Sequence, residues 1–182
     1  MIKTNFNFNI EFTFSGIKRS DLPESDPLHA FRFTRAGDYF VGGVLYISSD
    51  NTPLIVDSSG SPGVSDYCWT PFIQILKDAI PAIINGNSMQ IDFFDNPHHL
   101  TFVPTYDDEL FIYFISAVSG THPYRVCHVR KIVFFNTIFE CANDTINSIV
   151  NFDPDMESSE MMTDLKSALS TGRSLVMNSR YH

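Results

Sequence analysis

Basic residues are almost missing from the middle of this sequence. Lys77 is the only lysine or arginine between Gly37 and Tyr124, whereas ten aspartates and glutamates lie in that span. The whole chain carries 12 Lys and Arg against 21 Asp and Glu, a formal net charge of −9. Because an acidic surface repels phosphate backbones, direct nucleic-acid binding is disfavoured and a basic protein is the better electrostatic match. Acidic surfaces also keep proteins dissolved, so charge alone leaves both interpretations open.

Cysteine is scarce, and long apolar runs are absent. Cys68, Cys127 and Cys141 show no CxxC spacing and are odd in number. This pattern argues against a disulfide framework and for a reducing compartment. Residues 1–14 alternate polar and apolar instead of forming the apolar stretch of a signal peptide, and no run approaches the length of a membrane span. We therefore expect a cytoplasmic protein.

Tryptophan occurs once, whereas phenylalanine occurs 17 times. The clearest strand is rich in phenylalanine: five apolar residues alternate with polar ones in residues 5–14. These five are Phe6, Phe8, Ile10, Phe12 and Phe14. A period of two predicts a strand with one solvent-facing side, as in antiparallel sheets that are covered on a single face.

Several further strands follow from alternation and turn signals. Residues 31–34 and 39–48 are expected to be strands, and residues 54–56 a brief strand or a buried connector. Residues 89–94, 99–103, 110–116 and 124–129 predict an antiparallel meander, because their links are too short for helical crossovers. The Gly42–Gly43 pair predicts a bulge or a close backbone approach. Residues 57–66, rich in Ser and Gly, are expected to form a flexible loop.

Three segments show helical periodicity: residues 69–84, 132–150 and a last one from about 155 or 158 to 170. We expect Ser65 or Asp66 to cap the first helix and Pro81 to kink it. Gly172 should terminate the last helix, with residues 173–182 as a frayed tail. The order of elements predicts one α+β domain spanning residues 1–182. Its core would be a curved antiparallel sheet of about six to eight strands packed against three helices.

The histidines and cysteines are candidate chemical groups. His98 and His99 lie near Asp92, but adjacent residues of a strand point to opposite faces and cannot both bind one ion without distortion. Asp92 and His98 could still face each other across the turn. Cys127 and His128 meet the same geometric objection as a catalytic dyad. We expect no metal, no cofactor and buried apolar cysteines.

Two acidic clusters stand out. Asp107, Asp108 and Glu109 lie at an expected hairpin tip, where carboxylates are usually just solvated. The second cluster leads into the last helix, where acids complement the helix dipole. Its members are Asp153, Asp155, Glu157, Glu160 and Asp164. Together the clusters predict a sizeable negative surface.

The layout from Tyr39 to Gly172 resembles small bacterial proteins encoded beside polymorphic toxins, the immunity proteins of contact-dependent growth inhibition and related systems. The similar features are residues 43–47 before an acidic turn, the central helix ending in residues 83–86, and residues 91–94 feeding a hairpin. The Phe-rich helix of residues 132–150 follows.

The resemblance implies a protein without catalysis that binds a cognate toxin domain, such as a basic nuclease, and neutralises it. Charge would steer the encounter, and a few aromatic residues, Phe40, Tyr46, Tyr106 and Tyr113, could anchor it. The expected partner-binding residues are Tyr46, Asp92, Tyr106, Asp107, Asp108, Glu109, Asp153, Asp155 and Glu157. Two alternatives stay open: an acidic adaptor or regulatory module without a toxin, and a small hydrolase using the His98 or Cys127 region.

Overall fold

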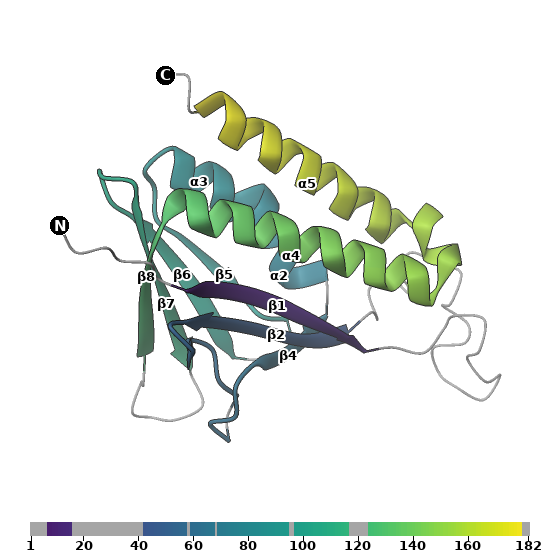
Figure 1. Cartoon of the computed structure of the whole chain (residues 1–182), viewed down its shortest axis with the longest axis horizontal. Helices are drawn as coiled ribbons and strands as arrows, with labels where there is room; N and C mark the ends of the chain where they lie inside the picture. The colour runs from purple at the N-terminus through teal and green to yellow at the C-terminus, as the bar shows by residue number, and fades with distance from the viewer. Residues whose placement is uncertain are drawn as a thin grey trace.

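The chain folds as an α+β protein, as the sequence predicts. The computed structural model describes residues 7–15, 42–57, 59–67, 69–94, 97–116 and 124–179. In these residues eight antiparallel strands form two four-stranded sheets, and helices lie over them (Figure 1). The expectation of one continuous curved sheet is therefore wrong. The strand expected at residues 31–34 lies outside the described residues.

The first sheet contains β1 (Phe8–Ser15), β2 (Gly42–Ser49), β3 (Thr52–Pro53) and β4 (Val64–Tyr67). Strand β2 is central and pairs with the other three. The alternation in β1 is confirmed, because Phe8, Ile10 and Phe12 are buried. Ile10 lies opposite Ile47, so apolar residues of adjacent strands share the inner face.

The glycine pair of β2 marks a close approach and not a bulge. Pairing with β1 runs without interruption through Gly42 and Gly43. A Cβ atom added at Gly43 would lie 2.5 Å from both a Phe12 ring atom and the Thr13 carbonyl oxygen. Only glycine therefore allows β1 to lie this close to β2 at that position.

The expected loop at residues 57–66 ends in a strand, which corrects the sequence prediction. Val64 is buried opposite Leu45, and β4 pairs with β2. Asp66 consequently lies in this strand, where its Oδ2 accepts a 2.8 Å hydrogen bond from the Phe94 amide. Ser65 also lies in β4, and the helix begins only at Trp69. Four residues of strand inside a Ser- and Gly-rich segment give too short a signal for pattern reasoning.

The second sheet is the predicted meander. It contains β5 (Met89–Asp92), β6 (His98–Pro104), β7 (Glu109–Ser116) and β8 (Tyr124–Arg130), paired in that order. Its inner face is fully apolar around Leu100, Ile112 and Phe114, none of which is exposed.

The first helical run holds a π-helical turn where the sequence predicts a proline kink. It comprises α2 (Trp69–Gln74), η3 (Ile75–Ala79) and α3 (Ile80–Ile84). The Ile80 amide donates to the Ile75 carbonyl, five residues back. Pro81 lacks an N–H group, and its ring would clash with the carbonyl four residues earlier. The wider turn before Pro81 accommodates this restriction, and Gly86, at φ +74°, follows the end of the run.

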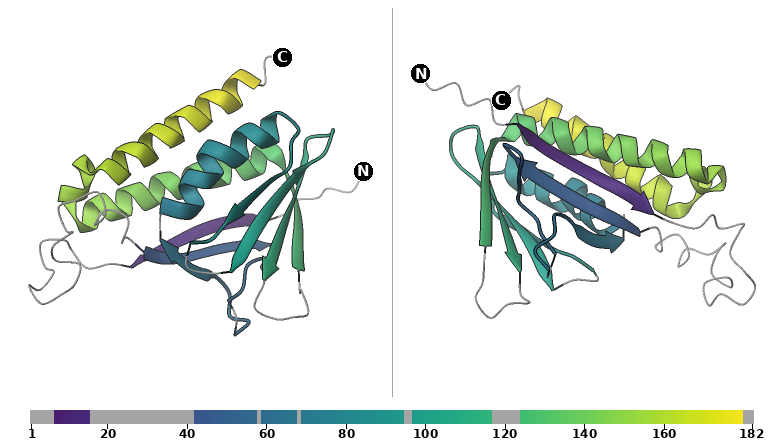
Figure 2. Two further views of the ribbon diagram at one scale, coloured as in Figure 1. Left: turned by 180° about the vertical axis from the view of Figure 1, so that it is seen from behind. Right: turned by 60° about the horizontal axis from the view of Figure 1, so that its bottom comes forward.

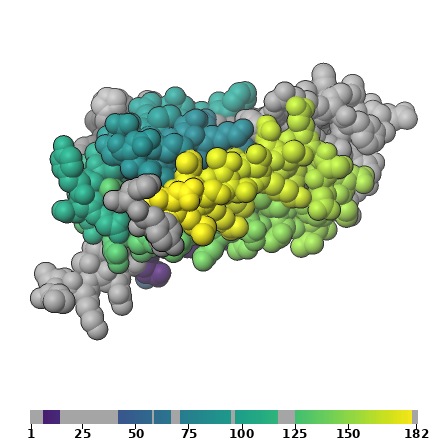
Figure 3. Space-filling view, turned by 90° about the horizontal axis from the view of Figure 1, so that it is seen from above, coloured from purple at the N-terminus to yellow at the C-terminus, as the bar shows by residue number. Residues whose placement is uncertain are grey.

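The last two helices cover the sheets. Helix α4 (Lys131–Phe152) agrees with the prediction; a 3₁₀ turn, η4 (Pro154–Ser158), and α5 (Glu160–Ser179) follow it. Figure 3 shows α5 lying across α4 and the α2–α3 run. The terminator predicted at Gly172 is wrong, and the frayed tail predicted at residues 173–182 is wrong as far as Ser179, where α5 ends. Residues 180–182 lie outside the described residues. A Cβ at Gly172 would meet Phe139 at 3.2 Å, so this glycine permits a close helix crossing and does not end the helix.

Phe134 of α4 connects the two sheets, which share no strand pairing in the described chain. Its ring centroid lies 6.3 Å from that of Phe8 in β1 and 5.4 Å from that of Phe102 in β6. All three side chains are buried. The core therefore lies between the two sheets and α4, and the described helices lie on one side of β5–β8 (Figure 2).

Candidate functional site

The hairpin tip between β6 and β7, residues 105–109, is held rigidly. The Thr105 amide donates to the Glu109 carbonyl at 3.0 Å, and the Thr105 hydroxyl lies 3.2 Å from the carbonyls of Asp107 and Glu109. Lys131, the first residue of α4, donates its Nζ to the Thr105 carbonyl at 2.8 Å and its amide to the Asp108 carbonyl at 2.9 Å. These two hydrogen bonds from Lys131 tie the backbone of the hairpin tip to the start of α4.

Two of the three carboxylates at the tip have partners on β8. Asp108 Oδ2 lies 3.2 Å from Arg130 Nη2, and Glu109 Oε2 lies 2.9 Å from His128 Nε2. Within the described residues, the Asp107 side chain contacts no basic group. With the Arg130 guanidinium and the Lys131 ammonium nearby, the three carboxylates leave a local excess of one negative charge. The tip is therefore much closer to neutrality than its sequence suggests.

Tyr106 is the most exposed large side chain at this tip. Its surface is fully accessible, with a relative exposure of 111%. The backbone on both sides is fixed by the Thr105 hydrogen bonds and by the pairing of Glu109 with Arg130. An aromatic ring is thus presented to solvent from a pre-ordered backbone, the arrangement that lowers the entropic cost of protein binding.

The other predicted contact residues on the strands are not beside the tip. Asp92 is exposed at the end of β5, where its Oδ1 accepts a 2.9 Å bond from Gln90 Nε2. It belongs to the same sheet as the tip but to the opposite corner. Tyr46 belongs to the first sheet and lines a shallow pocket of about 260 Å³ with Glu11.

The second acidic cluster lies at the far end of α4. Asp153 is buried, and its carboxylate accepts a bond from the Asp155 amide at the start of η4. Glu157 forms a 3.4 Å ion pair with Lys166. Since the tip contacts the first residue of α4 and Asp153 follows its last, about 33 Å of helix separate the clusters. They do not form one negative surface.

His98 is buried inside the second sheet. Only 2% of its surface is exposed, and its ring lies 5.4 Å from that of Phe114. Its Nδ1 atom has no hydrogen-bond partner in the described structure. Burial lowers the pKa of this imidazole, and the charge of Asp57 opposes this shift. Asp92 and His98, which could have faced each other across the turn, do not, because the register sets Asp92 opposite His99.

Neither a metal cluster nor a Cys–His dyad forms in the described part of the chain. No group of three or more His, Cys, Asp or Glu side chains there could hold a metal ion. Cys127 faces the core, and burial raises its thiol pKa to about 12. His128 points to the other side of β8 and stacks on Phe111 at 4.6 Å. Cys141 is likewise buried, with its pKa raised to about 12 by burial, whereas Cys68 lies outside the described residues.

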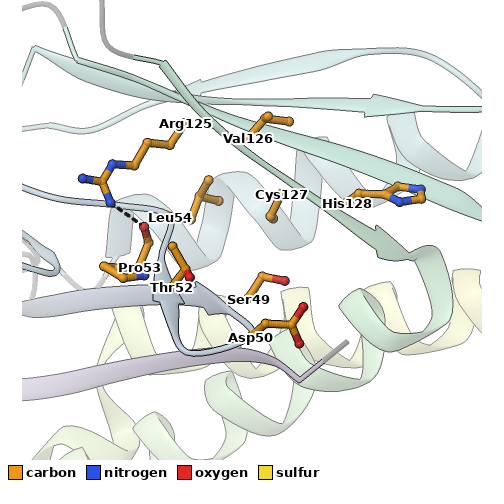
Figure 4. A pocket seen from close by; sticks show the side chains of 9 residues that line it. All are labelled: Ser49, Asp50, Thr52, Pro53, Leu54, Arg125, Val126, Cys127 and His128. Atoms are coloured by element: carbon orange, nitrogen blue, oxygen red, sulfur yellow. Dashed lines mark hydrogen bonds between the residues drawn. The ribbon is translucent and has the colours of Figure 1, made fainter. Parts of the chain in front are cut away.

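A cleft of about 540 Å³ separates the β2–β3 turn from β8 (Figure 4). Arg125 bridges it by donating Nη1 to the Pro53 carbonyl at 2.9 Å. Asp50 and His128 add a carboxylate and an imidazole to its wall. Sequence reasoning missed this cleft because its walls come from different sheets, whose relative position no local pattern encodes.

No family model, curated protein sequence or solved structure matches this chain.

None of the described helices has both the length and the apolar character needed to cross a membrane.

The side of the second sheet that faces away from the core also carries apolar side chains. There the alternate residues of β7, Phe111, Tyr113 and Ile115, are apolar and half-buried, while Leu110, Ile112 and Phe114 fill the core. This apolar outer face can be read from the sequence of β7, because the residues on both sides of the strand are apolar.

Proposed function

We propose that this protein is an immunity protein that binds a cognate toxin domain, such as a basic nuclease, in the cytoplasm and neutralises it. The observation that carries the proposal is Tyr106, a fully exposed aromatic residue on a braced hairpin tip. Blocking a toxin requires a tight, specific protein contact and no chemistry. The immunity protein would then act by covering the toxin's active site or its substrate path.

Tyr106 has the properties of a residue that anchors a protein–protein interface. Tyrosine is among the residues that dominate protein interfaces, and removing such an anchor commonly costs about 2 kcal/mol or more of binding free energy. Its backbone is already ordered by Thr105 and Lys131, so binding would not have to order the loop. A flexible acidic tip would lack this advantage.

The charges of the hairpin tip should contribute little to the affinity for the toxin domain and more to the rate at which the two proteins associate. Exposed ion pairs contribute at most about 1 kcal/mol, and two carboxylates of the tip are already engaged by Arg130 and His128. The net charge of −9 still favours approach of a basic partner over an acidic one. Asp107 is the tip carboxylate best placed to contribute, since no described basic group engages it.

The decisive test uses the product of the neighbouring gene. A protein with a variable C-terminal domain should be encoded beside this chain, and that domain should co-purify with it and inhibit growth when expressed alone. Tyr106→Ala should weaken the complex and restore growth inhibition, whereas Met177→Ala, at an exposed apolar residue of α5, should do neither.

Other results would overturn the proposal. A neighbouring product that binds but harms no cell would favour the acidic adaptor. A product that fails to bind would refute toxin neutralisation. The hydrolase alternative has no comparable support, because His98 and Cys127 are both buried in the core face of the sheet.

A further inference from the structure

We infer that the outer edge of β8, inside the cleft that faces the β2–β3 turn, binds an extended segment of the toxin domain as an added strand. The edge would supply backbone hydrogen bonds, and the two walls of the cleft would enclose the segment. The inference rests on the proposed function for the identity of the partner. It adds where the partner binds and which conformation the bound segment takes.

Strand β8 is the outermost strand of its sheet in the described chain. Its seven residues pair with β7 and with no other described strand. The outermost strand of a sheet presents a row of backbone N–H and C=O groups on its outer side. An extended polypeptide can pair with these groups and lengthen the sheet by one strand, a recurring mode of peptide recognition.

The hydrogen bonds between β7 and β8 decide which backbone groups of β8 point outward. The Lys131 amide donates to the Asp108 carbonyl, and this bond continues the register in which Cys127 lies opposite Ile112. In an antiparallel pair, the residues that exchange hydrogen bonds recur at every second position. The backbone groups of Cys127 therefore bond to β7, whereas those of Val126 point to the outer edge.

Val126 is accessible at this edge. Its surface is 48% exposed, whereas that of Val129 on the same strand is 1% exposed. In the described structure the Val126 amide makes no hydrogen bond on its outer side. An incoming carbonyl can therefore accept a hydrogen bond from this amide without displacing a partner within the protein.

The cleft follows the edge of β8. Residues 125–128 line one wall, and residues 49–50 and 52–54 line the other (Figure 4). Consecutive side chains of a strand point to opposite faces, so a cleft lined by four of them in a row runs along the edge and not over one face. Its volume of about 540 Å³ lies within the range of about 300–1,000 Å³ that is typical of ligand sites. Arg125 crosses to Pro53 at one end of the cleft (Figure 4).

The side chains of the cleft define the chemistry of the segment. Leu54 and Cys127, 3% and 8% exposed, contribute the apolar part of its lining. A strand added to β8 would place every second side chain on their side of the sheet, so these side chains should be small and apolar. Asp50 and Arg125 contribute one charge of each sign. Recognition should therefore depend on backbone hydrogen bonds and shape more than on charge.

The space in front of the edge favours a single segment over a second copy of this chain. Two copies joined at β8 would share a contact about 23 Å long and about 10 Å deep, which is about 230 Å² on each copy. A stable interface needs about 800 Å² from each partner. A toxin domain with a segment in the cleft could gain area at the hairpin tip, because β8 leads from the cleft to Arg130, which pairs with Asp108.

The first test measures amide hydrogen exchange by NMR in the protein alone and in complex with the purified C-terminal domain of the neighbouring gene's product. The Val126 amide should exchange readily in the protein alone. In the complex it should exchange at least tenfold more slowly, because the added strand accepts its hydrogen bond. The Cys127 amide is the internal control, since its bond to β7 should protect it in both states.

Two substitutions at Val126 separate the backbone from the side chain, with binding measured by titration calorimetry. Val126→Pro removes the amide and should weaken binding at least tenfold. Val126→Ala keeps the amide and should stay within threefold of wild type. Edge strands tolerate proline where the N–H group faces outward, so Val126→Pro should still fold, as circular dichroism would show. If it does not fold, the exchange measurement decides alone.

Each outcome decides. An unchanged Val126 exchange rate in a complex that forms refutes strand addition and leaves the proposed function standing. Equal losses of binding for Val126→Pro and Val126→Ala do the same, because they indicate a side-chain contact. A Val126 amide already protected in the protein alone overturns the inference: the edge is then covered by this chain itself or, if sedimentation finds a dimer, by a second copy. No binding by the wild-type protein refutes the proposed function and the inference with it.

Discussion

Phe134→Ala should be one of the most damaging single substitutions in this protein. Its side chain is fully buried, so the mutation removes a phenyl ring without any compensating exposure in the native state. Phe→Ala changes in cores cost about 3–5 kcal/mol, including the cavity that remains. Phe134 also contacts the rings of Phe8, Phe102 and Phe135, and such pairs contribute about 0.5–1.5 kcal/mol beyond burial. We therefore expect a loss in the upper part of that range, about 4–5 kcal/mol.

Urea unfolding followed by circular dichroism measures this loss. Because domains of this size are stable by about 5–15 kcal/mol, the variant should still fold, with a clearly lower midpoint. Met177→Ala, exposed on α5, is the control and should change stability by less than about 0.5 kcal/mol. A double-mutant cycle with Phe102→Ala should reveal coupling, since the two rings touch. A loss below about 1 kcal/mol for Phe134→Ala would refute the claim that this ring joins the two sheets.

Three further predictions follow from the packing and the buried groups. Gly172→Val should destabilise the fold by about 1–3 kcal/mol in thermal unfolding, because its side chain would press on Phe139. His98 should make the protein acid-sensitive: burial lowers its folded pKa below the ordinary 6.5, so its contribution is present above that pH and is lost as pH falls. His98→Leu should flatten the decline between pH 7 and 5, and an unchanged slope would contradict this. Cys127, with a pKa raised to about 12, should resist iodoacetamide at pH 8 until the protein is unfolded, as mass spectrometry of the alkylated peptide would show.

The strands and helices with strong periodicity were predictable from sequence. The alternation around Ile10 needs one covered face, and the meander of β5–β8 needs only short links. Sequence patterns failed to predict the structure at positions where tertiary contacts determine it. Gly172 reads as a helix end, yet it lies where α5 crosses Phe139. Val64 forms a strand because β2 offers it an edge opposite Leu45, and nothing in its own neighbours predicts that.

The candidate site was predictable in composition but not in its electrostatics. Sequence placed Tyr106 and three acids at a hairpin tip, because the turn residues between two apolar runs identify it. It could not predict that Arg130 and His128, more than twenty residues away in the chain, would engage two of those acids. The outer face of β7 was visible as apolar residues on both sides of one strand, and Phe111, Tyr113 and Ile115 on that face are half-buried.

The binding kinetics of Tyr106→Ala and Asp107→Asn against the neighbouring gene's C-terminal domain test the central claim most directly. Loss of an anchor that contributes about 2 kcal/mol should speed dissociation about thirtyfold and leave association nearly unchanged. Asp107→Asn should slow association and flatten its salt dependence, with dissociation nearly unchanged, since screening acts on exposed charges. Dissociation of Tyr106→Ala at the wild-type rate, from a complex that does form, would contradict the claim that the braced hairpin tip holds the partner.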